Sequence, residues 1–244
     1  SGLGLTIDHK AKKDSNKRIK ISIEQLVFAL LVEYQICLDP RNKKICEVEE
    51  IMQYLKRKRE AFAFFPNNIK GISLTPWKTR QINRFFYQAT GKRVKFFQRY
   101  NGNMQNIMVW GKRQKSDNYI SKVNNFISVE DGFVRSAGLG ADLYPPLSLL
   151  FDKKGIHYDA SKVSDLEDLL QNSKVNDSEK MRARKIIDLL IKLKISKYNL
   201  RLKKEMNLPN NIVNKQIIGV LGQVETDNSI IYGVPDDTIS KTNF

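Results

Sequence analysis

The stretch FISVEDGFVRS, residues 126–136, decides how the rest of this 244-residue sequence is interpreted. Its first four residues form an apolar run that is typical of a buried strand, and two adjacent acids and a glycine follow. Neighbouring side chains on a strand point to opposite faces, so Glu130 and Asp131 face different directions while the strand stays extended. Gly132 permits a sharp turn that aims one of these acids into a crevice. The stretch therefore predicts a carboxylate at the carboxyl end of a buried strand.

Strand and helix patterns alternate on both sides of this stretch. Strands are expected at residues 69–74, 93–98, 106–110, 125–129 and 216–221, and a further apolar stretch covers 147–151. Helices are expected at residues 77–90, which begin after Thr75-Pro76 and end at Gly91, at 114–123, at 163–171 behind a Ser161 or Ser164 cap, and at 178–196. This alternation predicts an α/β layer fold with a mainly parallel sheet, in which ligands bind outside the carboxyl ends of the strands.

The N-terminal part has a different pattern. Ser22 and Gln25 have the spacing of a capping box and begin a helix that should end near Asp39-Pro40, because the residue before a proline avoids helical angles. A second, amphipathic helix is expected from about Cys46 to Phe62. Its basic run at residues 56–59 either contacts phosphate or a membrane, or is simply the hydrated face of the helix.

Charge is the strongest feature of the composition. Lys and Arg number 42 against 26 for Asp and Glu, which gives a net charge of +16. Such a field attracts nucleic acid, acidic lipid surfaces, or acidic sugars and nucleotides, although part of the lysine excess can be solvated without any partner. No apolar run is long enough to cross a bilayer. Cys37 and Cys46 lack the neighbours of a zinc site, so we expect two free thiols in a reducing cytoplasm.

The acid-acid-glycine loop carries further polar residues. Arg135 and Ser136 follow the two acids and can bind an anion. Sugar transfer needs a carboxylate that attacks or stabilises the anomeric carbon, or that acts as a base. The alternative is an acidic loop in which Arg135 pairs with Asp131 or Asp142, and the spacing alone favours that alternative.

Two other strand ends offer polar groups. Lys112 follows Trp110-Gly111 and either meets an anion or is solvated. The block at 222–230 supplies Gln223, Asp227 and Ser229, which suit sugar or nucleotide hydroxyls but also suit a polar loop. His157 lies in an apolar stretch and is interpreted as a structural residue. The sequence contains no Walker loop, GxGxxG, HExxH, GxSxG or paired CxxC motif, which argues against the commonest ATPases, dinucleotide enzymes, zinc proteases and serine hydrolases.

Two long blocks resemble the signature of the KpsC/LipB capsule polysaccharide family. The first comprises residues 129–136, 138–149 and 155–160, and the second is GQVETDNSI at 222–230. Leu38-Asp39-Pro40 with Cys46 and a charged helix resembles that family's inter-module segment. Trp77-Lys78 and Val109-Trp110-Gly111 resemble the opening of its second module, and residues 2–6 are similar to the tail of a preceding module.

The resemblance implies an α/β fold in which a Rossmann-like parallel sheet forms the N-terminal half of a GT-B-type glycosyltransferase, preceded by a helical linker. It implies a retaining enzyme that transfers Kdo from CMP-β-Kdo to the poly-Kdo linker on a lysophosphatidylglycerol anchor, in capsule biosynthesis and export. Such a protein is cytoplasmic and peripheral to the inner membrane. Its implied partners are CMP-Kdo, the glycolipid acceptor, the membrane surface and capsule biosynthesis or export proteins, with no nucleic acid, metal or cofactor.

The resemblance also assigns roles to residues. Asp131 is implied as nucleophile or as stabiliser of the anomeric centre, and Glu130 as the supporting acid or base. The implied substrate-binding residues are Lys112, Arg135 and Ser136 for the Kdo carboxylate or acceptor, and Gln223, Asp227 and Ser229 near the donor. His157 stands where the family has a tyrosine, which favours its structural interpretation.

The expected domain organisation follows from the same resemblance. Residues 1–20 form the tail of a preceding module, 21–66 a helical linker, 67–200 the first Rossmann-like domain, and 201–244 a linker with the first strand of the second domain. The family's downstream Lys-Pro-His-Pro element is absent, so a fragment without turnover of its own is expected. The alternative from a different class is a basic α/β module that binds nucleic acid or acidic lipid without catalysis.

Overall fold

The computed structural model describes residues 21–72, 74–112, 120–200, 216, 218, 224 and 226–233. The chain divides into two compact units, Ser1–Ala61 and Phe62–Phe244, and the helix α2 (Val48–Phe64) runs across this boundary. Each unit is described by itself. None of the helices in the described part of the chain has both the length and the apolar character needed to cross a membrane.

The first unit begins with the expected capping box. The Ser22 hydroxyl accepts a hydrogen bond from the Gln25 backbone and the Gln25 side chain accepts one from the Ser22 backbone, which starts α1 (Ile23–Val27). The helix continues as the π-helical turn η3 (Phe28–Glu33) and ends there. The expectation that it reaches Asp39-Pro40 is wrong, because β1 (Cys37–Leu38) pairs with β2 (Ile45–Cys46) in a short antiparallel hairpin. Cys37 and Cys46 are free thiols, as expected.

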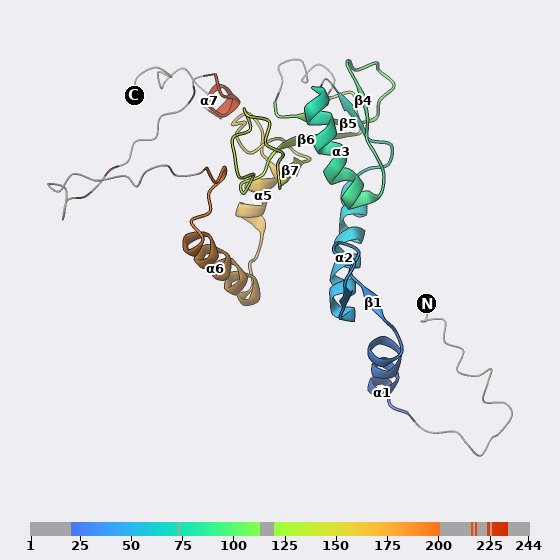
Figure 1. The fold of residues 1–244 in the computed structure, drawn as a ribbon. Helices are drawn as coiled ribbons and strands as arrows, with labels where there is room; N and C mark the ends of the chain where they lie inside the picture. The colour runs from blue at the N-terminus through green and yellow to red at the C-terminus, as the bar shows by residue number, and fades with distance from the viewer. Residues whose placement is uncertain are drawn as a thin grey trace. The chain divides into compact units, whose positions relative to one another are not determined.

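The second unit is built on a five-stranded sheet of order β4-β3-β5-β6-β7 (Figure 1). The strands are β3 (Lys70–Ile72), β4 (Lys95–Phe97), β5 (Asn106–Trp110), β6 (Asn125–Asp131) and β7 (Leu149–Asp152). The first four are parallel to one another, and β7 runs antiparallel to β6 at the edge. The predicted α/β class with a mainly parallel sheet is therefore confirmed, with one antiparallel edge strand added.

The helix α3 (Pro76–Thr90) connects β3 to β4 and covers one face of the sheet. Thr75 caps its N-terminus, Pro76 occupies the first turn, and Gly91 ends it with a left-handed φ of 71°. Ile82 and Phe86 of α3 are buried against Ile127 and Val129 of β6. The opposite face of the sheet has a second core that includes Ile72, Ile107 and Val109.

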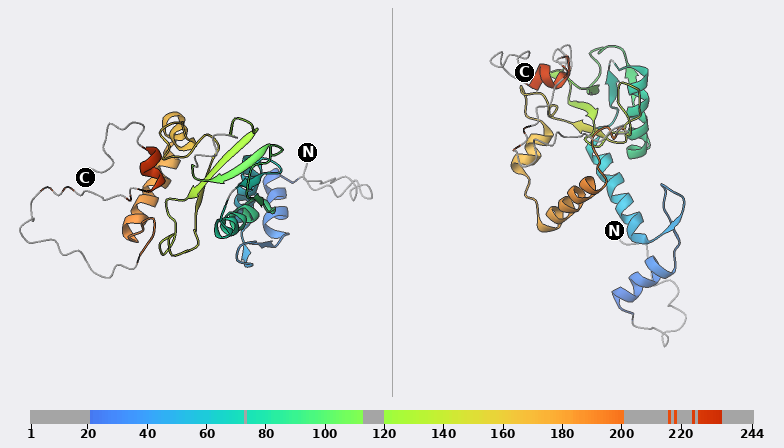
Figure 2. Two further views of the ribbon diagram at one scale, coloured as in Figure 1. Left: turned by 90° about the horizontal axis from the view of Figure 1, so that it is seen from above. Right: turned by 60° about the vertical axis from the view of Figure 1, so that its left-hand side comes forward.

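Three helices follow β7. They are α5 (Asp165–Asn172), capped by Ser164 rather than Ser161, α6 (Asp177–Lys192), capped by Asn176, and the short α7 (Asn228–Gly233). Figure 2 shows them on the side of the sheet away from α3. Most of the expected segments 114–123 and 216–221 lie outside the described residues.

The strand order has a topological switch point between β3 and β5. The chain leaves β3 for β4 on one side and later returns to add β5 on the other side. A crevice opens at such a point outside the carboxyl ends of the strands, because the two connections diverge. The N-terminus of α3 and the end of β5 flank this crevice, where the Lys78 ammonium lies 4.5 Å from the centre of the Trp110 ring.

Gly71 is required for the packing of β3 against β4. A Cβ atom at this position would overlap the ring of Phe96, its register partner on β4. We therefore expect Gly71→Ala to lower the free energy of unfolding by about 1–3 kcal/mol, since the ring must leave its position. Urea denaturation measures the change. The exposed neighbour Lys95→Ala serves as control and should change stability by less than about 0.5 kcal/mol; an unchanged midpoint for Gly71→Ala would contradict the close packing.

Candidate functional site

The two adjacent acids lie at the carboxyl edge of the sheet, where sequence analysis placed them. The strand β6 extends two residues beyond its expected end, and Glu130 and Asp131 pair with Leu150 and Leu149 of β7. Their side chains contact different partners, as the alternation along a strand requires. The strand ends at Asp131 and the backbone bends at Phe133 and Val134, directly after Gly132, although Gly132 itself has no left-handed φ angle. Gly132 also allows a close approach: a Cβ atom there would overlap the Ser148 hydroxyl.

Asp131 is held by a buried arginine. Arg135 Nε lies 2.6 Å from Asp131 Oδ2, and only 1% of the Arg135 side chain is exposed. Asp131 is 17% exposed, and its Oδ1 atom is buried with no hydrogen-bond partner in the described part of the chain. Buried polar atoms without partners are costly and are kept mainly at strained or functional sites. The structure shows Arg135 paired with Asp131, which is one of the two pairings expected for the non-catalytic alternative of an acidic loop.

The loop after β6 is organised around Arg135. Its Nη1 atom donates to the Ser136 hydroxyl at 2.8 Å and to the Tyr144 carbonyl at 3.1 Å. The Ser136 hydroxyl in turn donates to the carbonyl of Gly138. Arg135 and Ser136 are thus both buried, and in this structure they hold Asp131 and the loop in place rather than facing solvent.

Glu130 lies in a cage of hydrogen-bond donors. Its Oε1 atom accepts from Trp110 Nε1 at 3.1 Å and from the Asp131 backbone at 3.0 Å. Its Oε2 atom accepts from the Tyr158 hydroxyl at 3.3 Å. Burial raises the pKa of the Glu130 carboxyl, and the adjacent Asp131 charge adds to this, against the opposing effects of these donors and of Lys78. A raised pKa makes the Glu130 carboxylate a stronger base than an ordinary glutamate.

Gly111 leaves room for this cage. It has a left-handed φ of 61°, and a Cβ atom there would lie 2.6 Å from the Tyr158 hydroxyl and 3.1 Å from Glu130 Oε2. Any other residue at the end of β5 would therefore push Tyr158 and Glu130 apart. The Lys112 backbone N–H donates to the same tyrosine hydroxyl at 3.0 Å. Burial and the Glu130 charge together raise the pKa of Tyr158, so its hydroxyl stays protonated and donates its hydrogen bond to Glu130.

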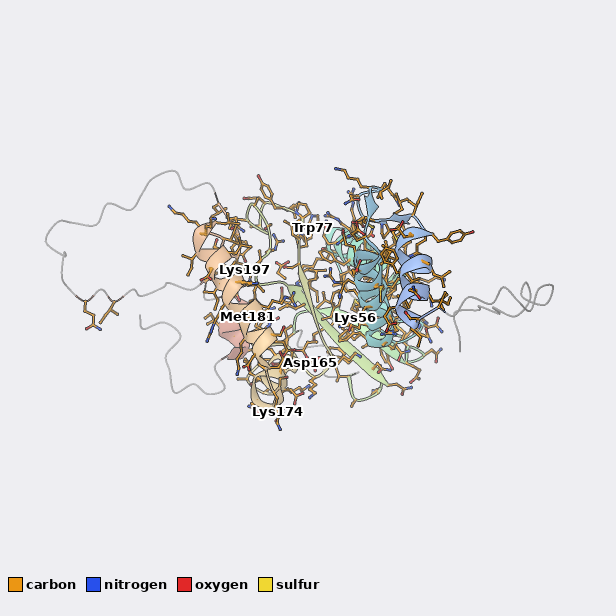
Figure 3. The ribbon with its side chains drawn as sticks, turned by 90° about the horizontal axis from the view of Figure 1, so that it is seen from below. Lys56, Trp77, Asp165, Lys174, Met181 and Lys197 are labelled. Carbon is orange, nitrogen blue, oxygen red and sulfur yellow. The ribbon has the colours of Figure 1, made fainter. Side chains whose placement is uncertain are left out.

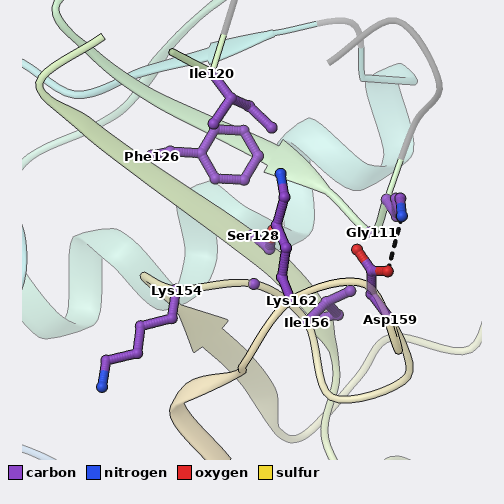
Figure 4. Close-up of a pocket in the computed structure, with 10 residues that line it drawn as sticks. Gly111, Ile120, Phe126, Ser128, Lys154, Ile156, Asp159 and Lys162 are labelled. Carbon is purple, nitrogen blue, oxygen red and sulfur yellow. Dashed lines mark hydrogen bonds and ion pairs between the residues drawn. The ribbon is translucent and has the colours of Figure 1, made fainter. Parts of the chain in front are cut away.

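Lys112 is anchored beside the cage. Its ammonium group donates to Asp159 Oδ1 at 2.7 Å and to the Ser161 hydroxyl at 3.0 Å, and it lies 4.6 Å from the centre of the Tyr232 ring. Figure 4 shows the small pocket that this ion pair borders, on the Ser128 side of β6. Lys154 also lines this pocket, but its side chain points away from the other lining residues. The Lys112 charge is thus neutralised by Asp159 in this structure.

The segment at 226–233 docks onto the same loop. The Ala160 backbone N–H donates to the Tyr232 carbonyl at 3.0 Å, and the Asn228 side chain hydrogen bonds to Tyr158. Asp227 accepts hydrogen bonds from the backbone and the hydroxyl of Ser229, which caps α7. Asp227 and Ser229 therefore bond to each other, while Asn228 between them reaches the Glu130 cage. Gln223 lies outside the described residues.

Sequence analysis missed four residues of this site: Trp110, Tyr158, Asn228 and Lys78. Trp110 was named as a neighbour of Lys112, and Tyr158 fell within the block 155–160, neither with a role of its own. One signal was available for Asn228, because Asp227 two residues before Ser229 is a helix-capping pattern that fixes the side chains around it. His157, interpreted as structural, packs between Phe133 and Tyr158 with ring centres 5.3 Å apart on each side. Burial lowers its pKa.

The described residues contain no group of three or more His, Cys, Asp or Glu side chains that could hold a metal ion. What the site does contain is an ion-paired carboxylate, a second carboxyl group with a raised pKa, and a neighbouring phenol. This combination can supply a nucleophile and a proton-transfer group at one sheet edge. The fold and site together define an α/β protein with paired acids at the carboxyl edge of parallel strands.

The chain belongs to the family described as capsule polysaccharide biosynthesis protein, whose model matches residues 105–243. It is 30% identical over 251 residues to the capsule polysaccharide modification protein LipA of Neisseria meningitidis serogroup A, a match that covers 96% of this chain and 35% of LipA. It is 36% identical over 135 residues to the lipopolysaccharide-processing protein LpsZ of Rhizobium meliloti, covering 53% of this chain and 30% of LpsZ. The chain thus spans about a third of the length of the curated relatives it matches.

A solved structure shows the same fold. KpsC of Thermosulfurimonas dismutans, a β-Kdo 2,7 transferase, superimposes with a TM-score of 0.50 at 30% sequence identity, over 69% of this chain and 53% of that chain. The resemblance to KpsC/LipB-type proteins that the two sequence blocks indicated is confirmed by these relatives.

The hydrogen bond from the Tyr158 hydroxyl should lower the pKa of the Glu130 carboxyl group. This hydrogen bond favours the charged carboxylate, so we expect Tyr158→Phe to raise the pKa of Glu130 further and to keep the group protonated to higher pH. The indole N–H of Trp110 contacts Glu130, and its NMR shift followed against pH reports the titration. Tyr144→Phe is the matched control and should leave the midpoint unchanged. An unchanged midpoint in Tyr158→Phe would show that the hydroxyl does not act on Glu130.

Proposed function

We propose that this chain forms part of a retaining β-Kdo glycosyltransferase that acts in capsule polysaccharide synthesis. The observation that carries the proposal is the pair of adjacent acids in two different environments: Asp131 is ion-paired with Arg135, and Glu130 is buried with a raised pKa. Enzymes that transfer sugars with retention use one carboxylate at the anomeric carbon and a second carboxyl group for proton transfer. The likeness to a β-Kdo 2,7 transferase supports Kdo as the transferred sugar.

The proposed chemistry has two steps. In the first, Asp131 attacks or stabilises the anomeric carbon of Kdo while the bond to CMP breaks. In the second, an acceptor hydroxyl bonds to that carbon, its proton passes to a base, and the contact with Asp131 is released, which retains the configuration. Glu130 is the proposed proton acceptor, because its pKa is raised and Tyr158 fixes its orientation.

The remaining roles rest on the resemblance and on the charge. CMP-β-Kdo is the proposed donor, and the poly-Kdo linker on a lysophosphatidylglycerol anchor is the proposed acceptor. The proposed location is the cytoplasmic surface of the inner membrane, beside other capsule biosynthesis and export proteins. Donor, acceptor and membrane are all anionic, so the net charge of +16 raises their local concentration. A basic module that only binds polyanions would not need a buried acid held by three donors.

Asp131→Asn tests this proposal. The amide keeps the shape of the side chain and an oxygen that faces Arg135, whereas an alanine would leave the buried guanidinium unpaired at a cost of about 3–5 kcal/mol. We expect Asp131→Asn, in the protein expressed from the full gene, to lose Kdo transfer from CMP-Kdo by about a thousandfold or more while its circular dichroism spectrum is unchanged.

The matched control is Asp142→Asn, which makes the same chemical change at an exposed position of the same loop. It should keep full activity. An Asp131→Asn enzyme with the activity of the parent would remove Asp131 from the reaction, and a parent without any transfer to a Kdo acceptor would overturn the proposed activity.

A further inference from the structure

An open groove of about 880 Å³ runs along the outer face of α3, away from the Glu130 cage. Four residues of this helix form one row on its surface, because they are spaced by three or four positions: Trp77, Arg80, Arg84 and Tyr87. Leu143 and Pro145 of the loop after β6 form the facing wall. At a rise of 1.5 Å per residue the row is about 15 Å long, which exceeds the size of one sugar ring.

The groove is positively charged and has no counter-charge of its own. Arg80, Arg84 and Arg93 line it, and none of its lining residues is acidic. No acidic residue in the described ranges forms an ion pair with Arg80 or Arg84. Lys112, beside the Glu130 cage, differs in this respect, since it is paired with Asp159. Guanidinium groups without acidic partners are poised to bind carboxylates in a bidentate manner.

Aromatic rings stand at both ends of the row. The Arg93 guanidinium lies 5.7 Å from the centre of the exposed Tyr87 ring at the far end. Trp77, labelled in Figure 3, lies at the near end in the first turn of α3. Its ring centre is 6.0 Å from the guanidinium carbon of Arg135, which holds Asp131. The groove therefore leads from the proposed catalytic carboxylate along the helix.

We propose that this groove binds the acceptor of the reaction, an oligosaccharide that carries carboxylate groups. This inference rests on the proposed function and deepens it. Arg80 and Arg84 bind successive carboxylates of the chain, and the rings of Trp77 and Tyr87 contact the apolar faces of its sugars. Trp77 places the end of the chain next to Asp131. The arginines thus make the groove specific for acidic acceptors over neutral ones.

Binding of a synthetic β-linked Kdo disaccharide, measured by isothermal titration calorimetry on the full chain, tests the groove. We expect Arg80→Gln/Arg84→Gln to weaken binding by at least about tenfold, because two charge-assisted contacts are lost. The matched control is Arg182→Gln/Arg184→Gln, which removes the same charge from exposed positions of α6 and should leave the affinity unchanged. A neutral glucose oligomer should not bind measurably.

Equal affinity of the Arg80→Gln/Arg84→Gln variant and the parent chain for the disaccharide would overturn the proposal. It would also be overturned if the parent bound a thymidine oligonucleotide more tightly than the disaccharide and the variant lost that binding. The experiments separate an error in the proposed acceptor site from an error in the proposed transferase activity. Asp131→Asn should bind the disaccharide while losing transfer. If transfer is absent from the parent but disaccharide binding depends on Arg80 and Arg84, the acidic-saccharide groove stands and the transferase activity does not.

Discussion

The buried guanidinium of Arg135 is the constraint on which the site depends. A charged group with 1% of its side chain exposed needs partners on every side, and each partner it has fixes a different part of the molecule. Asp131 ties it to the end of β6, and Ser136 and the Tyr144 carbonyl tie it to the following loop. The backbone amides of Arg135 and Ser136 both donate to the Lys197 carbonyl, which brings the segment after α6 to the same place. The guanidinium thus joins the end of β6 to the following loop, and the backbone at the same position joins both to the segment after α6.

Glu130 and Asp131 have different surroundings because neighbouring side chains of a strand lie on opposite faces of the sheet. Asp131 meets a cation, while Glu130 meets neutral donors in a buried position. The difference is imposed by the backbone, since any residue pair at the end of β6 would diverge in the same way. The neutral surroundings of Glu130 come from three distant parts of the chain, namely the end of β5, the loop after β7 and α7. Adjacent residues of one strand thus present carboxyl groups to two different environments.

Local signals in the sequence predicted much of the fold. Thr75-Pro76 and Gly91 bounded α3 to within one residue, and residues 106–110 gave β5, because capping and strand patterns are set by neighbouring residues. The position of Asp131 at a strand end also followed from its local pattern. The features that the sequence did not predict depend on contacts between residues far apart in the chain. The role of Gly132 is decided by Ser148, and the Glu130 cage joins residues 20 and 28 positions apart in the chain. No periodicity carries that information, so the contact of Tyr158 with Glu130 could not be placed beforehand.

The antiparallel direction of β7 has a consequence for how such a protein can diversify. A parallel strand would have drawn the chain back across the sheet before adding the next strand, whereas the antiparallel hairpin leaves both ends of the 132–148 connection at one edge. Leu149 opposite Asp131 fixes the point of return, and Arg135 within the connection holds the carboxylate, so only side chains that do not contact Arg135 can change while Asp131 stays in place. Leu143 and Pro145 are such side chains, so the wall of the groove beside α3 can differ between related chains without disturbing the surroundings of Asp131.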